Sequence, residues 1–172
     1  FSDYLHPYDE SHIIGIGKDV PESGLAIPEG VKLSFFDVTD VENPKEISRY
    51  LIGSRGTDSE ALRDHKAFLF SREKSLLVIP ILLAEGQDYR YTWQGAYVFG
   101  LDLESGFTLR GRVSHAQEED AGDKDFYYSF SPLAIKRSLY MDNVLYTISE
   151  GLVKMNALDS LEELNIVKLP AP

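Results

Sequence analysis

The chain has 172 residues, of which 43% are hydrophobic, and a formal net charge of −11 at pH 7. This length and apolar content are enough to bury one sizeable core or several small ones, so a disordered chain is not expected. The negative charge repels phosphate backbones and anionic membrane surfaces, which argues against nucleic acid as a partner. Because no apolar run approaches the ~20 residues of a membrane span, no membrane insertion of this segment is expected.

Cysteine is absent, which excludes disulfide frameworks, thiolate metal sites and thiol nucleophiles together. Tyrosine and phenylalanine are plentiful, whereas runs of helix-favouring residues are short and interrupted by 13 glycines and 8 prolines. This balance favours strands and turns. The chain begins at Phe1 without an initiator methionine or a leader, so we expect it to be a piece of a longer protein.

The first unit of the chain, 1–56, contains short apolar runs separated by turn-forming residues. The predicted strands of this unit are 4–8, 12–17, 32–37 and 46–52.

The second unit, 57–116, repeats the pattern most clearly. Its predicted strands are 67–70, 76–81, 96–102 and 107–113, with a loop at 85–93. The second of these strands is apolar at consecutive positions, which indicates that both of its faces are buried.

The third unit, 117–172, repeats the pattern more compactly. Its predicted strands are 138–141, 144–149, 152–158 and 164–169. A tight turn is expected at Asp142 and Asn143, with Asn143 in the positive-φ region that asparagine tolerates.

Three sequential four-stranded units with short internal turns predict an all-β fold of three consecutive antiparallel blades, a partial β-propeller within a single segment, 1–172. The alternative is a β-sandwich or a small closed barrel. A propeller closes with 4 to 8 blades, so an arc of three exposes the outer faces of its first and last blades. We therefore expect upstream blades or self-association of the chain.

Several segments in order resemble a known family. They are LHPYDE at 5–10, IIGIG at 13–17, FFDVTD at 35–40, DHKAF at 64–68, QGAYVF at 94–99, GRVSH at 111–115, RSLY at 137–140 and LYTIS at 145–149. Together they are similar to the C-terminal part of secreted archaeal and bacterial β-propeller proteins distantly related to WD-repeats. The resemblance implies a secreted or cell-surface protein with further blades upstream, and it supplies no activity to transfer.

Asp64 and His65 are the candidate catalytic pair, because a carboxylate beside an imidazole can serve as a general base. The structural alternative, which we favour, is that these side chains hydrogen-bond within a blade, as an Asp and a His do in WD-type blades. No nucleophile motif accompanies the pair.

The most acidic loop, 117–125, carries Asp120, Asp123 and Asp125, whose oxygens are candidate calcium ligands. The loop lacks the EF-hand spacing, so a solvated linker without any cofactor is the favoured interpretation. Aromatic side chains that combine apolar area with a polar tip form a candidate binding surface. These are Tyr89, Tyr91, Trp93, Phe126, Tyr127 and Tyr128.

Two functions remain open from the sequence. The first is a non-enzymatic extracellular binding or scaffold module that recognises a protein or a glycan. The second is a hydrolase or lyase whose carboxylates gather at the mouth of the propeller channel. Among Asp64, His65, Asp102 and Asp37, this function would be supported if two carboxylates, or a histidine and a carboxylate, converged in one open cleft. The fold cannot decide between them, because propellers host both.

Overall fold

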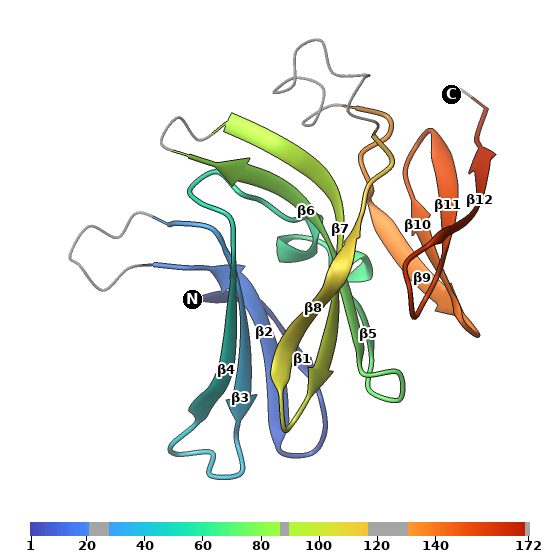
Figure 1. Ribbon diagram of the computed structural model, residues 1–172. Coiled ribbons are helices and arrows are strands. Elements are labelled where there is room, and N and C mark those ends of the chain that lie inside the picture. Colours follow the sequence, from blue (N-terminus) through green and yellow to red (C-terminus); the bar gives the residue numbers. More distant parts are fainter. Residues whose placement is uncertain (21–27, 87–89, 117–130, 171–172) are drawn as a thin grey trace.

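The computed structural model describes residues 1–20, 28–86, 90–116 and 131–170. These residues form three four-stranded antiparallel sheets that stand side by side, coloured blue to cyan, green to yellow, and orange to red in Figure 1. Within each sheet the strands follow one another in chain order. The predicted all-β class and its three sequential four-stranded units are therefore confirmed.

We call the three sheets blade 1, blade 2 and blade 3. Blade 1 consists of β1 (Ser2–Pro7), β2 (His12–Lys18), β3 (Val31–Asp37) and β4 (Lys45–Ile52). Two short 3-10 helices, η1 (Glu60–Leu62) and η2 (His65–Ala67), lead to blade 2, which consists of β5 (Leu69–Ser71), β6 (Leu76–Glu85), β7 (Arg90–Asp102) and β8 (Gly106–Val113). Blade 3 consists of β9 (Arg137–Met141), β10 (Val144–Ile148), β11 (Leu152–Ala157) and β12 (Glu163–Lys168).

The structure corrects two details of blade 2. The first strand was predicted at 67–70, but Ala67 closes η2 and the strand begins at Leu69. The side chain of Asp64 accepts a hydrogen bond from Lys66 N–H, which starts the helical turn there. The predicted loop at 85–93 is also too long, because β6 continues to Glu85 and β7 begins at Arg90.

The tight turn of blade 3 is present, but its positive-φ residue was assigned wrongly. Met141 pairs with Val144, so the turn has two residues, and Asp142 has a φ of 51°. Asn143 is not among the described residues with positive φ. The left-handed position is therefore the first of the turn, where Asp also tolerates such a backbone.

Strand β6 explains how the blades stack. Leu77 and Ile79 point toward blade 1 and belong to a core cluster that also contains Ile14, Leu33 and other blade 1 residues. The alternating residues Leu76 and Val78 belong to a second cluster, shared with blade 3. Because successive side chains of a strand point to opposite faces, one strand serves both junctions and is apolar from Leu76 to Ala84.

The two ends of the sheets differ in their connections. At one end, the lower one in Figure 1, short turns join the first strand of each blade to the second and the third to the fourth. We call this end the turn rim. At the opposite end, which we call the loop rim, β2 ends and β3 begins, β6 ends and β7 begins, and β8 ends and β9 begins.

Candidate functional site

The carboxylates at the ends of the third strands close turns on the turn rim. Asp37 accepts a hydrogen bond from Thr39 N–H at 2.8 Å, and Asp102 accepts from Glu104 N–H at 2.9 Å and from Ser105 N–H at 2.7 Å. The hydroxyl and N–H of Thr39 hold the pKa of Asp37 below its ordinary value, and those of Ser105 do the same for Asp102. Each carboxylate is thus held by its own turn, as a weak base.

Asp64 and His65 lie at the start of η2, apart from those turns, with Asp64 as the N-cap and His65 as the first helical residue. Asp64 accepts from Lys66 N–H and from the guanidinium of Arg137, which reaches it from β9 of blade 3. The Lys66 hydrogen bond and the Arg137 charge hold the pKa of Asp64 below its ordinary value. The carboxylate is therefore engaged in capping a helical turn and in joining two blades.

The exposed His65 instead belongs to a row of aromatic rings between blades 1 and 2. Its ring centroid lies 6.3 Å from that of Tyr4, which in turn lies 5.4 Å from Phe68. Tyr4 also shares a 3.0 Å hydrogen bond between its hydroxyl and Nδ1 of His6. The row continues from His6 to Phe70 with centroids 5.5 Å apart. These contacts pack β1 against β5 and the preceding turn, as aromatic pairs do in cores.

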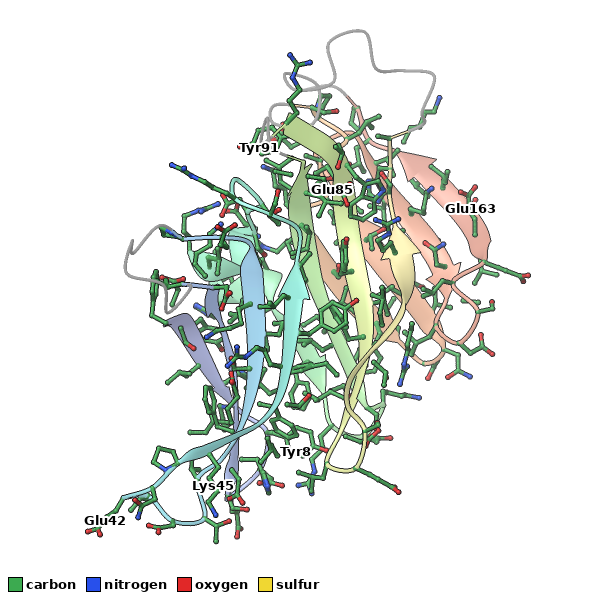
Figure 2. The ribbon with its side chains drawn as sticks, turned by 60° about the vertical axis from the view of Figure 1, so that its left-hand side comes forward. Tyr8, Glu42, Lys45, Glu85, Tyr91 and Glu163 are labelled. Atoms are coloured by element: carbon green, nitrogen blue, oxygen red, sulfur yellow. The ribbon has the colours of Figure 1, made fainter. Side chains whose placement is uncertain are left out.

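Of the proposed aromatic binding residues, Tyr91 and Trp93 can be placed. Both lie on β7 near the loop rim, and Figure 2 shows Tyr91 at the end of the molecule opposite to Tyr8. The Trp93 ring is half-buried against the core of blades 1 and 2, with the guanidinium of Arg112 5.0 Å from its centroid and the Tyr97 ring 5.4 Å away. Trp93 is thus a packing residue with a cation–π contact, whereas Tyr91 is half-buried near the start of β7.

The other candidates fall outside the described residues. They are Tyr89, Phe126, Tyr127 and Tyr128 for binding, and Asp120, Asp123 and Asp125 for calcium. Within the described ranges, no group of three or more His, Asp or Glu side chains is placed to hold a metal ion. No helix in those ranges is long and apolar enough to cross a membrane.

A cavity of about 160 Å³ lies at the loop-rim end of the junction between blades 2 and 3. Its charged lining comes from Asp58, Glu60, Arg63 and Lys136. Asp58 and Arg63 form a bidentate pair, with nitrogen–oxygen distances of 3.1 and 2.7 Å. Tyr91 and Trp93 do not line this cavity. The cavity is thus a polar hollow with charges of both signs, built by the chain segments that enter blades 2 and 3.

The wall of this cavity includes the buried amide of Gln94. Its Nε2 donates to the carbonyl of Ile135 at 3.0 Å, and its Oε1 accepts from Ile135 N–H at 2.9 Å. This two-way bond fixes the segment before β9 to β7 of the neighbouring blade, so the cavity has a rigid wall.

Sequence reasoning missed the hydrogen-bonding role of a buried histidine, His115. This side chain follows β8, is 4% exposed, and contacts two hydroxyls of blade 3. Its Nδ1 lies 3.0 Å from Oγ of Ser149, and its Nε2 lies 2.8 Å from Oγ1 of Thr147. Burial lowers the pKa of His115 to about 4, and the Lys154 charge acts in the same direction.

The backbone after β10 also holds Ser149 in place. Its hydroxyl lies 3.2 Å from the carbonyl oxygen of Leu152, to which it can donate, and accepts from Leu152 N–H at 3.2 Å. His115 therefore contacts a hydroxyl that the turn after β10 already positions. The role predicted for Asp64 and His65, a buried hydrogen-bonding group within the blades, is thus filled by His115.

Comparison with known proteins places the chain in a family. The family model described as "Beta propeller domain" matches residues 1–161. An uncharacterized protein of Archaeoglobus fulgidus is 38% identical over 155 residues, which cover 87% of this chain and 20% of that protein. An uncharacterized protein of Methanocaldococcus jannaschii is 30% identical over 159 residues, which cover 92% of this chain and 19% of that protein. The chain therefore spans about a fifth of the length of these curated relatives. Its three sheets are consecutive blades, and the chain belongs to the β-propeller domain family.

Proposed function

We propose that this chain is a non-enzymatic binding segment of an extracellular β-propeller, and that its loop rim recognises a protein or glycan ligand. The observation that carries the proposal is the structural difference between the turn rim and the loop rim. The turn rim consists of tight turns whose carboxylates are held locally, whereas Tyr91 and the polar cavity lie at the loop rim. Binding residues concentrate on such loops because a rigid sheet holds them in place.

The cavity supports a polar ligand. Glu60 and Lys136 line it beside the paired Asp58 and Arg63, so hydrogen-bond donors and acceptors both face the hollow. Sugar hydroxyls and polar peptide side chains offer the matching groups. An extracellular setting is supported by the resemblance to secreted propellers.

The non-enzymatic part of the proposal is supported by the positions of the carboxylates. Asp37 and Asp102 close separate turns on the turn rim, while Asp64 caps η2 and pairs with Arg137. A hydrolase or lyase needs an acid and a base on the two sides of one substrate bond. These three side chains are held by different local partners.

A binding screen with matched variants tests the proposal. Arrays of soluble oligosaccharides and extracellular peptides would be probed with the chain and with Lys136→Ser, Tyr91→Ser and Lys45→Ser. We expect at least one array member to bind, with at least a tenfold loss in Lys136→Ser or Tyr91→Ser. Lys45 lies on the turn rim (Figure 2), so Lys45→Ser should bind unchanged.

The fate of the array member that binds distinguishes a binding module from a hydrolase or lyase. After prolonged incubation, mass spectrometry should recover the ligand intact. A cleaved product would refute the non-enzymatic proposal and favour the hydrolase or lyase. Labelling of intact cells by an antibody against the chain tests the extracellular location, and labelling only after permeabilisation would contradict it.

A further inference from the structure

The cavity at the junction between blades 2 and 3 has an apolar side. Pro80 and Leu82 are alternating residues of β6, so they share the face of blade 2 that carries Val78, a member of the cluster shared with blade 3. Ile135, which is 1% exposed and belongs to the same cluster, lines the cavity from the segment before β9. These side chains offer a small hydrophobic surface inside an otherwise polar hollow.

Polar backbone groups beside this apolar surface are already paired. The N–H of Leu82 donates to the carbonyl of Asp58, and the carbonyl of Leu82 accepts from Asp58 N–H, each at 2.8 Å. The carbonyl of Pro80 accepts from Oγ of Ser59 at 2.6 Å. A ligand group that contacts Pro80 and Leu82 thus meets backbone groups that are already satisfied, which favours an apolar group at this place.

The four charged side chains of the lining are of two kinds. Asp58 holds the guanidinium of Arg63 through two hydrogen bonds, and the ammonium of Lys18 lies 3.7 Å from the same carboxylate. In the part of the chain that the structure describes, the carboxylate of Glu60 and the ammonium of Lys136 form no hydrogen bond and no ion pair. Asp58 and, more weakly, Glu60 raise the pKa of Arg63, so Glu60 acts on that guanidinium through its charge alone. Glu60 and Lys136 therefore remain to meet a ligand.

The balance of charge around the cavity selects the class of ligand. Its lining carries two acidic and two basic side chains and so has no net charge, whereas the whole chain carries −11. The field of the chain repels a simple anion, and a simple cation would leave Lys136 unpaired beside it. A ligand with both charges is itself neutral and satisfies both side chains through charge-assisted hydrogen bonds. The volume of about 160 Å³ lies below the ~300–1,000 Å³ of sites for drug-sized molecules, so the ligand is small.

We propose that the cavity binds a free α-amino acid with a small aliphatic side chain. The carboxylate of the amino acid pairs with Lys136, and its ammonium pairs with Glu60. Its side chain packs on the apolar surface of Pro80, Leu82 and Ile135. An α-amino acid carries its two charges and its side chain on one carbon atom, so a small cavity can meet all three groups.

This assignment rests on the proposed function only in placing ligand binding at the loop rim. It names a small ligand for the cavity, whereas Tyr91 lies outside the cavity and remains for a larger ligand. Glu60 belongs to η1, which leads into blade 2, and Lys136 immediately precedes β9 of blade 3. An amino acid bound between them links the two blades and should therefore stabilise the folded chain.

Isothermal titration calorimetry on the purified chain tests the amino acid site. The probes are L-alanine and L-valine, each beside an analogue without the ammonium, propionate or isovalerate, and an analogue without the carboxylate, ethylamine or isobutylamine. We expect saturable binding of at least one of the two amino acids, and binding of both of its analogues should be at least about tenfold weaker. The same amino acid should raise the thermal midpoint of the chain.

Matched variants locate the site. Lys136→Ser and Glu60→Gln should each weaken amino acid binding at least about tenfold, because each removes one charged partner of the ligand. Lys45→Ser and Glu104→Gln remove the same kinds of charge on the turn rim and should leave binding unchanged. Circular dichroism would confirm that each variant is folded.

Three results would overturn the amino acid site. They are no binding of either amino acid at millimolar concentration, an analogue that binds as tightly as its amino acid, and binding that survives both Lys136→Ser and Glu60→Gln. The array screen gives a separate answer. Amino acid binding without any array ligand would refute only the protein or glycan ligand, and an array ligand without amino acid binding would refute only the amino acid site.

Discussion

The two blade junctions of this chain join sheets of the same four-stranded form but differ in their side chains. Between blades 1 and 2, large rings meet: Tyr50 packs on Phe99 with centroids 4.9 Å apart, and Phe35 and Phe99 both lie near Phe107. Phe35 and Phe99 are fully buried. This junction is stabilised chiefly by apolar area, which is not directional and depends little on the exact partner.

Between blades 2 and 3, the buried apolar side chains are smaller and polar groups accompany them. Leu76, Val78 and Leu145 belong to a cluster whose buried members, within the part of the chain that the structure describes, are all aliphatic. Hydrogen bonds from Gln94 and His115 cross the same junction, and the hydroxyls of Ser71 and Tyr140 share another at 2.9 Å.

This difference shows that stacked blades are specified in two ways. An aromatic junction tolerates changes of partner but loses much free energy when a ring is removed. A junction with buried hydrogen bonds gains less net free energy, yet it becomes costly when one partner is lost, because the other is left unsatisfied. The two junctions should therefore respond differently to truncation, pH and salt.

The largest effect is expected from removing a ring at the aromatic junction. Phe99→Ala should lower the free energy of unfolding by about 3–5 kcal/mol, through lost burial and a residual cavity. Val98→Ala, the neighbouring residue that faces blade 3, should cost about 2 kcal/mol. Urea unfolding of both variants measures the difference, and equal costs would refute the contrast between the junctions.

Loss of the buried imidazole is the next largest effect. His115→Leu removes the hydrogen-bond partner of Thr147 Oγ1, whereas Ser149 keeps its bonds to Leu152. An unsatisfied buried hydroxyl should lower the free energy of unfolding by about 1–3 kcal/mol. The double variant His115→Leu with Thr147→Val removes both partners and should recover part of that loss. A double variant that is less stable than His115→Leu would argue that Thr147 is satisfied without His115.

The same histidine, at the junction between blades 2 and 3, should make the free energy of unfolding depend on pH. The pKa of His115 is about 4 in the folded chain, against an ordinary value of 6.5. Because the unfolded chain binds the proton more readily, the free energy of unfolding should fall as pH drops from 6.5 to about 4 and should level off below that value. Solvent near the loop rim screens part of the burial penalty, so we expect a loss of about 1–2 kcal/mol between pH 7 and pH 5.

Chemical unfolding at pH 7 and pH 5 measures this loss. His6, whose pKa is also lowered by partial burial, adds to the slope in the same range. The comparison is therefore between the wild type and His115→Leu, which should lack the His115 part. If the two chains lose equal free energy between these pH values, His115 does not carry the proposed pH dependence.

Much of the fold could be predicted because the pattern of apolar residues within a single strand indicates which of its faces are buried by neighbouring blades. Consecutive apolar residues in β6 indicated burial on both faces, and the structure divides Leu76 and Leu77 between the two junctions. Errors arose where side chains act on the backbone: Asp64 caps a helical turn before β5, and Asp142 takes the left-handed position in the turn of blade 3.

The hydrogen-bonded group of His115, Thr147 and Ser149 could not be located from the sequence, because its members are far apart in the chain. His115 meets Thr147 and Ser149 across 32 and 34 residues. One signal was present in the second strand of blade 3. Thr147 of β10 carries a hydroxyl at a position that faces the neighbouring blade, whereas the equivalent positions in blades 1 and 2 are the isoleucines Ile16 and Ile79. A hydroxyl in a buried strand position requires a partner, and an isolated histidine upstream of the blade is a candidate.

The smallest expected effect concerns the charged link across the polar junction. Arg137 of β9 pairs with Asp64 of η2, and both side chains are about one-third exposed. Arg137→Gln should lower the thermal midpoint slightly at low salt, because solvent and ions screen such pairs. Arg49→Gln, which loses a pair with Glu46 inside β4, is the matched control, since that pair joins no blades. At 1 M salt the Arg137 variant should melt like the wild type. A deficit that persists at 1 M salt would show that Arg137 acts through packing at the junction instead of through its charge.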